Sequence, residues 1–107
     1  MTRRFDKSRA LADRFHGVIP GGAHTYAKSD DQYPEDTAPI IVRGHGCRVW
    51  DADGNDFIEY GSGLRAVTLG HAHDVVNQGV CREMQQGTNF TRPSIIELEC
   101  AEDFLAL

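Results

Sequence analysis

The stretch after the double glycine Gly21-Gly22 gathers side chains suited to binding a small polar molecule. Its members are His24, Thr25, Tyr26 and Lys28. Glycines let a backbone come close to a ligand, so these side chains are candidates for a binding pocket, and Tyr26 is the strongest candidate among them. The alternative interpretation is a mobile surface loop whose polar groups meet only solvent.

A second stretch, Gly63 to Val67, places one cation among apolar residues. Either the stem of Arg65 packs while its head reaches solvent, or the side chain contacts a bound ligand. Leu64 is correspondingly either an ordinary core residue or part of a pocket wall. The two lysines, Lys7 and Lys28, do not lie among apolar residues, so the sequence does not predict a nucleophilic lysine with a lowered pKa.

Metal chemistry finds little support in the spacing of the possible ligands. His71 and His73 would share one face of a strand, but no CxxC or HExxH spacing accompanies them. The acidic stretch from Asp51 to Ser62 only partly matches a calcium loop, because its glycine comes too early and Ser62 stands where the last acidic ligand belongs. We therefore expect a backbone turn there and no metal.

Composition narrows the class of protein. The chain has 107 residues, a net charge of −5 and 40% hydrophobic residues, which predicts at most one ordinary globular domain and gives no basic surface for nucleic acid. No apolar run approaches the roughly 20 residues that span a bilayer, and the N-terminus lacks a secretory signal. Three widely spaced cysteines indicate reduced thiols. We expect a cytoplasmic protein without nucleic-acid or membrane partners.

The first half of the chain predicts one helix and three strands. Residues Asp6 to His16 form an amphipathic pattern, and Gly17 is expected to cap that helix in a left-handed conformation. An irregular loop follows over 23–38. Three β-prone runs come next, punctuated by glycine-rich turns, and predict an antiparallel meander with Trp50 and Tyr60 as its largest packing groups. These runs are Pro39 to Arg43, Cys47 to Asp51 and Phe57 to Tyr60.

Two further helices are expected. One covers Asp74 to Gln86, with Gly87 after its end. The other begins with a capping box made by Ser94 and Glu97. Its acidic, apolar last turn lacks the usual stop signals, so we expect the natural polypeptide to continue beyond Leu107. The predicted fold class is thus an α+β segment with an N-terminal helix, a three-stranded antiparallel meander and two more helices.

Several short motifs occur together in one order and spacing. They are Ile19 to Gly22, Arg43 to Gly46, Val49 to Tyr60, Leu69 to His73, Gly87 to Phe90, and Pro93 with Glu97 and Glu99. This combination resembles the N-terminal segment of class III aminotransferases, and the glutamate-1-semialdehyde aminomutase-like branch in particular. The resemblance covers nearly the whole chain.

The resemblance implies a fold type I enzyme that uses pyridoxal 5′-phosphate (PLP) and works as a homodimer or larger assembly. Residues 1–93 would belong to its small domain, and residues 94–107 would begin the helix leading into the large coenzyme-binding domain. The lysine that forms the Schiff base would lie downstream, so this chain alone is expected to be inactive. Its own residues would line the substrate side of the pocket, with Phe90 at the rim.

Departures from the aminomutase pattern argue against glutamate-1-semialdehyde as the substrate. The family's arginine after the Ile19 to Gly22 motif is replaced by Lys28, which cannot offer a carboxylate two parallel hydrogen bonds. The family's serine-tryptophan-glycine is replaced by Gly63-Leu64-Arg65. These changes favour amino transfer between another amine, amino acid or amino sugar and a carbonyl acceptor. Arg65 then becomes a candidate anchor for an anionic or polyhydroxylated substrate.

Two other hypotheses stay open. The chain could be a truncated, non-catalytic module for dimerisation or interaction, in which case the face meant for a large domain would be exposed. It could also be a small metal protein. The leading hypothesis is the N-terminal portion of a PLP-dependent class III aminotransferase.

Overall fold

The computed structural model of the chain describes residues 3–107 and divides them into two compact units. The first unit extends to His73 and holds all the described strands, and the second is Asp74–Leu107. None of the described helices is long and apolar enough to cross a membrane.

The predicted meander is confirmed. Strands β1 (Ile41–His45), β2 (Arg48–Asp51) and β3 (Asp56–Ile58) form one antiparallel sheet in the order β1-β2-β3. The register shifts between Ile41 and Arg43, so β1 is irregular at Val42. The sheet therefore sits where the alternation of apolar runs and glycine-rich turns predicts it.

The two expected packing groups of the sheet behave differently. The guanidinium carbon of Arg43 lies 3.5 Å from the centroid of the Trp50 ring, and the indole is half-buried under it. The prediction for Tyr60 is wrong, because this residue is 90% exposed. Tyr60 follows β3 at the edge of the sheet, where no described element covers it.

Helix α1 (Asp6–Val18) is longer than predicted. The expected left-handed cap at Gly17 is wrong, because the helix passes through that residue. Ile19, at φ −123° and ψ 118°, is the first extended residue. Since a residue before proline is pushed out of the helical region, Pro20 rather than Gly17 sets the end of the helix.

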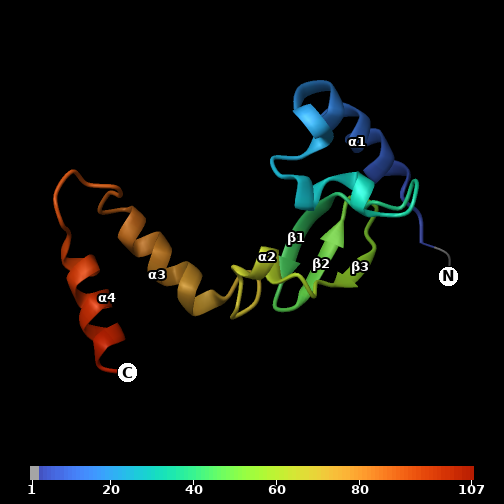
Figure 1. Ribbon diagram of the computed structural model, residues 1–107. Helices are drawn as coiled ribbons and strands as arrows, with labels where there is room; N and C mark the ends of the chain where they lie inside the picture. The colour runs from blue at the N-terminus through green and yellow to red at the C-terminus, as the bar shows by residue number, and fades with distance from the viewer. Residues whose placement is uncertain (1–2) are drawn as a thin grey trace. The chain divides into compact units, whose positions relative to one another are not determined.

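The turn between β2 and β3 binds the start of α1. Asp51 is almost fully buried, and its carboxylate accepts hydrogen bonds from the backbone amides of Asp53 and Asn55 at 3.0 and 2.7 Å. Asp53 in turn accepts the amides of Lys7 and Ser8, both at 2.8 Å. Figure 1 shows α1 beyond the end of the sheet toward which β2 points. The carboxylates that resemble a calcium loop are thus engaged in holding the turn and capping a helix.

Replacing Ser8 with alanine tests this junction. The Ser8 hydroxyl is fully buried, donates to Asp53 at 2.8 Å and accepts from the amide of Ile40 at 3.2 Å. Ser8→Ala leaves the Ile40 amide without its partner, so we expect unfolding by urea to require about 1–3 kcal/mol less free energy. The exposed position Ala10 on the same helix supplies the control, since Ala10→Ser should change stability by less than about 0.5 kcal/mol. Equal effects of the two substitutions would contradict the bridging role of Ser8.

The expected irregular loop contains three single 3-10 turns. They are η1 (Pro20–Gly22), η2 (Tyr26–Lys28) and η3 (Asp30–Gln32). After β3 the chain forms the four-residue turn α2 (Ser62–Arg65), which Figure 1 shows at the opposite end of the sheet from α1. The loop and α2 carry most of the residues singled out from the sequence.

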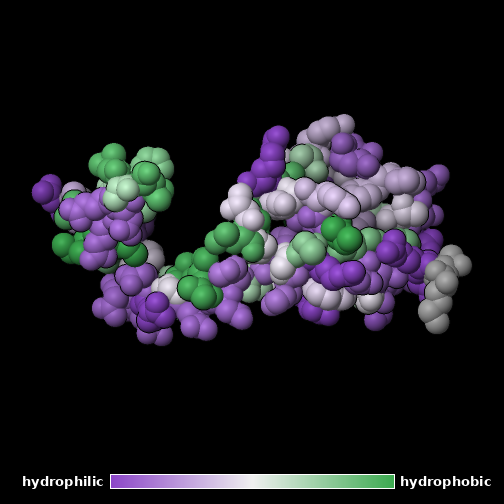
Figure 2. All heavy atoms as spheres, turned by 90° about the horizontal axis from the view of Figure 1, so that it is seen from below, coloured by the Kyte–Doolittle hydropathy of each residue, from purple (hydrophilic) through white to green (hydrophobic). Residues whose placement is uncertain are grey.

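The second unit consists of α3 (Asp74–Met84) and α4 (Ile95–Leu105), as predicted. Gly87 takes φ +103° after α3, and the Ser94 amide donates to Glu97 at 2.7 Å in the expected capping box. Apolar side chains of both helices are exposed, and Figure 2 shows hydrophobic groups gathered on this unit. Val49, in the first unit, is the only buried residue among the described hydrophobic ones. Most of the apolar surface of residues 3–107 therefore remains uncovered.

Candidate functional site

The glycine motif before the first candidate stretch makes a close contact with α1. Gly21 and Gly22 have φ values of +75° and +71°. A Cβ on Gly22 would lie 2.8 Å from the ring of His16, a distance at which something must move. The double glycine therefore lets the chain turn back against the last turn of α1 before it reaches His24.

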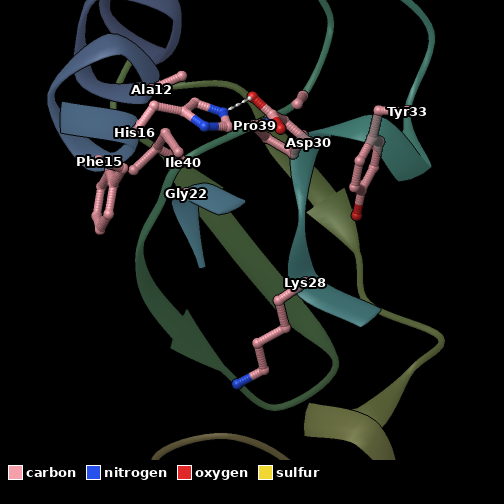
Figure 3. Close-up of a pocket in the computed structure, with 10 residues that line it drawn as sticks. Ala12, Phe15, His16, Gly22, Lys28, Asp30, Tyr33, Pro39 and Ile40 are labelled. Atoms are coloured by element: carbon pink, nitrogen blue, oxygen red, sulfur yellow. Dashed lines mark hydrogen bonds and ion pairs between the residues drawn. The ribbon is translucent and has the colours of Figure 1, made fainter. Parts of the chain in front are cut away.

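The stretch that follows is tied to α1 by one polar pair. The Nε2 atom of His16 lies 2.8 Å from Oδ2 of Asp30, and the buried Ser29 hydroxyl donates to the carbonyl of Gly21 at 3.3 Å. Figure 3 shows the imidazole pointing at Asp30, whereas Lys28 extends away from this pair. The hydrogen bond from His16 is the main reason why the pKa of Asp30 is lowered.

The cavity beside this pair is too small for an organic ligand. It measures about 40 Å³ and is lined by residues of α1 and of the loop, including His16, Gly22, Lys28 and Asp30. A buried water needs roughly 10–15 Å³ on such a measure, so the cavity has room for only a few waters. Tyr26 is 74% exposed, and His24 and Lys28 are also exposed. The first candidate stretch thus lies on the surface, and its pocket role stays a prediction.

We expect the pair formed by His16 and Asp30 to make a pH-dependent contribution to the free energy of unfolding. Because the folded pKa of Asp30 is lowered, the pair stabilises the fold above about pH 4, the ordinary value for aspartate, and loses this effect as the pH falls through the lowered pKa. Both side chains are more than a third exposed, so we expect Asp30→Asn to cost less than about 1 kcal/mol at pH 5. Urea unfolding at several pH values should show the difference from wild type shrinking in acid. A difference that grows below pH 4 would contradict this origin.

The second candidate stretch is held by a carboxylate and an imidazole. The Nε2 atom of His71 lies 2.8 Å from Oε2 of Glu59, and both side chains are about a quarter exposed. The amide of Gly63 donates to the two Glu59 oxygens at 3.0 and 3.2 Å. Glu59 therefore joins the end of β3 both to α2 and to the segment that follows it.

Glycines allow His71 to dock on the hairpin between β1 and β2. Gly46 and His71 exchange two backbone hydrogen bonds of 2.9 and 2.8 Å. A Cβ on Gly44 would lie 2.8 Å from the His71 side chain, and one on Gly70 would lie 2.9 Å from the Gly46 backbone. The two glycine-rich motifs thus form one tight backbone junction, in which His71 is structurally engaged.

The turn α2 has an unusual backbone. Its four residues, Ser62 to Arg65, have φ values of 44°, 59°, 58° and 70°. For a residue other than glycine this left-handed conformation costs about 1–2 kcal/mol, and three of the four are not glycine. Gly63 is required, because a Cβ there would lie 2.5 Å from Val67. Strain of this kind gathers at functional sites, where the surrounding structure maintains it.

Ser62, the first residue of the turn, lines an open cavity of about 250 Å³, whereas Leu64 and Arg65 are not among its lining residues. Polar groups of Glu59, Ser62, Thr68 and His71 line the cavity together with Val67 and Leu69. Leu64 is 48% exposed, and Arg65 is exposed as well. Within residues 3–107 no carboxylate lies at ion-pair distance from Arg65. The guanidinium is therefore available to an anionic group from outside these residues.

Phe90 lies in the second unit, between α3 and α4. Its ring packs on Gly87, where an added Cβ would be 3.1 Å away, and it stays 57% exposed. The described residues bring Leu64 and Arg65 together in α2, and His24, Thr25, Tyr26 and Lys28 together in the loop. Phe90 belongs to a different unit from these two groups, so its rim position stays a prediction.

Glu59 was not predicted from the sequence as a residue of the site, and His71 was considered there only as a possible metal ligand and as part of the motif Leu69 to His73. A signal was present, because an acidic residue four positions before Gly63 can accept the amide of a glycine turn. The pairing with His71 joins residues 12 positions apart, which no local pattern indicates.

Comparison with known proteins places these features in a wider context. No family model matches the chain. The glutamate-1-semialdehyde 2,1-aminomutase of Desulfitobacterium hafniense is 35% identical over 100 residues, which are 92% of this chain and 23% of that protein. The chain therefore spans about a quarter of the length of this curated relative.

Solved structures of transaminases are also similar to this chain. A transaminase with PLP bound superposes with a TM-score of 0.82 at 32% identity, over 94% of this chain and 23% of the other. An omega-transaminase from Sphaerobacter thermophilus gives a TM-score of 0.76 at 31% identity, over 88% of this chain and 20% of the other. The likeness thus extends over nearly all of this chain and a minor part of each relative.

Proposed function

The chain is a class III aminotransferase-like N-terminal segment, and from this premise we propose that it orients the substrate in a PLP-dependent aminotransferase. The complete enzyme would move an amino group between an amine, amino acid or amino sugar and a keto or aldehyde acceptor. The observation that carries the proposal is Arg65, which is exposed without an ion-pair partner among residues 3–107 on a strained turn. The first residue of that turn, Ser62, lines an open cavity.

The residues of this chain do not make a coenzyme site by themselves. Lys28 borders only the 40 Å³ cavity, and Lys7 lies exposed in the first turn of α1. Neither described lysine adjoins the larger cavity, which is lined by the carboxylate of Glu59 and by no lysine or arginine. A phosphate-bearing coenzyme calls for the opposite charge. We therefore assign no catalytic residue here and propose that the coenzyme is held mainly outside these residues.

The substrate we propose differs from glutamate-1-semialdehyde. The family's tryptophan would cover the substrate with an indole, whereas Leu64 offers a smaller apolar surface at that position. Arg65 replaces a glycine, so it brings a cation where the family has none. An anionic or polyhydroxylated substrate would satisfy this guanidinium. The aminomutase-like relatives therefore share the framework while the groups facing the substrate differ.

The remaining features of the proposal concern the complete protein. We propose a cytoplasmic homodimer or larger assembly that acts on small molecules, without nucleic-acid or membrane partners. The apolar side chains exposed on α3 and α4 support packing against further protein surface. The same exposure supports the second candidate function, a non-catalytic module for dimerisation or interaction.

Coenzyme titration separates the two candidates. We expect the complete gene product, purified without PLP, to bind the added coenzyme and to shift its absorbance band. The 107-residue chain alone, titrated in parallel, should leave the spectrum of free PLP unchanged. If the complete product also leaves the spectrum unchanged, the aminotransferase proposal is wrong and the interaction module is favoured.

A further inference from the structure

We infer that Glu59 and His71 are positioning residues that hold the turn Ser62–Arg65 in its left-handed form and thereby aim Arg65 at the substrate. This inference rests on the proposed function. It extends that function by naming side chains that act through Arg65 rather than on the substrate.

The residues of the turn do not by themselves account for its left-handed conformation. Left-handed backbone is unfavourable for Ser62, Leu64 and Arg65. Burial of side chains does not offset this cost, because Leu64 is 48% exposed and Arg65 is exposed too. The turn therefore needs a restraint from outside its own residues. Because its side chains are exposed, we infer that the turn serves to hold them in position for a ligand.

Glu59 provides the restraint on the backbone of the turn. Both of its carboxylate oxygens accept the Gly63 amide, at 3.0 and 3.2 Å, in the middle of the turn. The other backbone bonds of the turn are local and include those from Arg65 to Gly61 at 2.8 Å, from Val67 to Ser62 at 2.9 Å and from Ala66 to Ser62. Glu59 is the side chain, among the described residues, that bonds to the backbone of the turn.

His71 holds the Glu59 side chain in place relative to the sheet. Its imidazole lies 2.8 Å from Glu59 and packs on Gly44, while its backbone exchanges two hydrogen bonds with Gly46. The hairpin is thereby connected to Arg65 through two side chains. Loss of either should free the turn without removing the guanidinium.

Limited proteolysis reads the turn directly. Trypsin cleaves after arginine and needs an extended backbone, so the left-handed turn should protect the Arg65–Ala66 bond. In the complete gene product we expect Glu59→Ala and His71→Ala to speed cleavage there about tenfold, relative to cleavage after Arg92 in the same sample, because cleavage follows the population of the opened form.

Two further variants serve as controls. Glu59→Gln keeps an acceptor for the Gly63 amide, so its cleavage rate should remain near that of wild type. Glu83→Ala, which removes an exposed acid on α3, is the matched control. Unchanged relative cleavage in Glu59→Ala would overturn the inference.

Kinetics then test whether the restraint serves the substrate. For an anionic amino donor, Glu59→Ala should raise KM about tenfold, and Arg65→Ala combined with Glu59→Ala should be no worse than Arg65→Ala alone. Additive losses, or a changed cleavage rate with unchanged KM, would overturn the positioning role. If the complete gene product transfers no amino group at all, the proposed function is wrong. The proteolysis experiment still decides in that case whether Glu59 and His71 hold the turn.

Discussion

Replacing Arg65 with alanine in the complete enzyme is expected to lower kcat/KM for a carboxylate-bearing amino donor by roughly 10- to 100-fold. This is the range that hydrogen bonds to a charged group contribute when the partner is left without them. The effect should be specific, because no carboxylate within residues 3–107 lies at ion-pair distance from this guanidinium. Neutral amine donors should lose little. Initial rates with a matched pair of donors, one anionic and one neutral, measure the difference.

Two further variants sharpen this prediction. Arg65→Lys keeps the charge but loses the two parallel hydrogen bonds, so its kcat/KM should lie between those of wild type and alanine. Arg14→Ala removes an exposed cation from α1 and should leave both donors unaffected. An equal loss for anionic and neutral donors in Arg65→Ala would show that the residue supports the fold rather than the substrate.

Gly70→Ala is expected to destabilise the first unit strongly. The position has φ +92°, and a Cβ there would lie 2.9 Å from the Gly46 backbone, which cannot move without breaking the junction with His71. Left-handed strain and overpacking together should cost roughly 2–4 kcal/mol, a large part of the stability of an ordinary domain. Urea unfolding gives the value.

The second unit offers a control of opposite sign. Gly79 lies inside α3, and a Cβ there would meet only the end of the Arg82 side chain, 3.9 Å away. Gly79→Ala should therefore stabilise the helix by up to about 1 kcal/mol. If Gly70→Ala and Gly79→Ala change stability alike, the close contact between Gly70 and Gly46 does not exist in solution.

Local patterns were enough to predict most of the fold. The alternation of apolar runs with glycine-rich turns placed the three strands, and Ser94 with Glu97 marked the start of α4. The end of α1 was misjudged because two stop signals competed. Gly17 can adopt a helical backbone, so the helix continues through it. The ring of Pro20 disfavours a helical backbone at Ile19, and the helix therefore ends there.

The site could be predicted only in part. Arg65 is visible as a cation in an apolar stretch, yet nothing in the sequence reveals four consecutive left-handed residues around it. That conformation depends on Glu59, which His71 holds from a segment after the turn. Tyr60 was misplaced for a similar reason, because aromatic character alone does not tell which edge of a sheet is covered. Contacts between distant residues decide such features.

Transfer of labelled nitrogen tests whether the complete protein is an aminotransferase whose substrate is oriented by this chain. The complete gene product would be incubated with PLP, a 15N-labelled anionic amino donor and a keto or aldehyde acceptor, and the products analysed by mass spectrometry. We expect 15N in the aminated acceptor, in amounts that depend on both PLP and Arg65. If the coenzyme is bound but no label reaches any acceptor in a broad panel, then this chain is not the substrate-orienting segment of an aminotransferase.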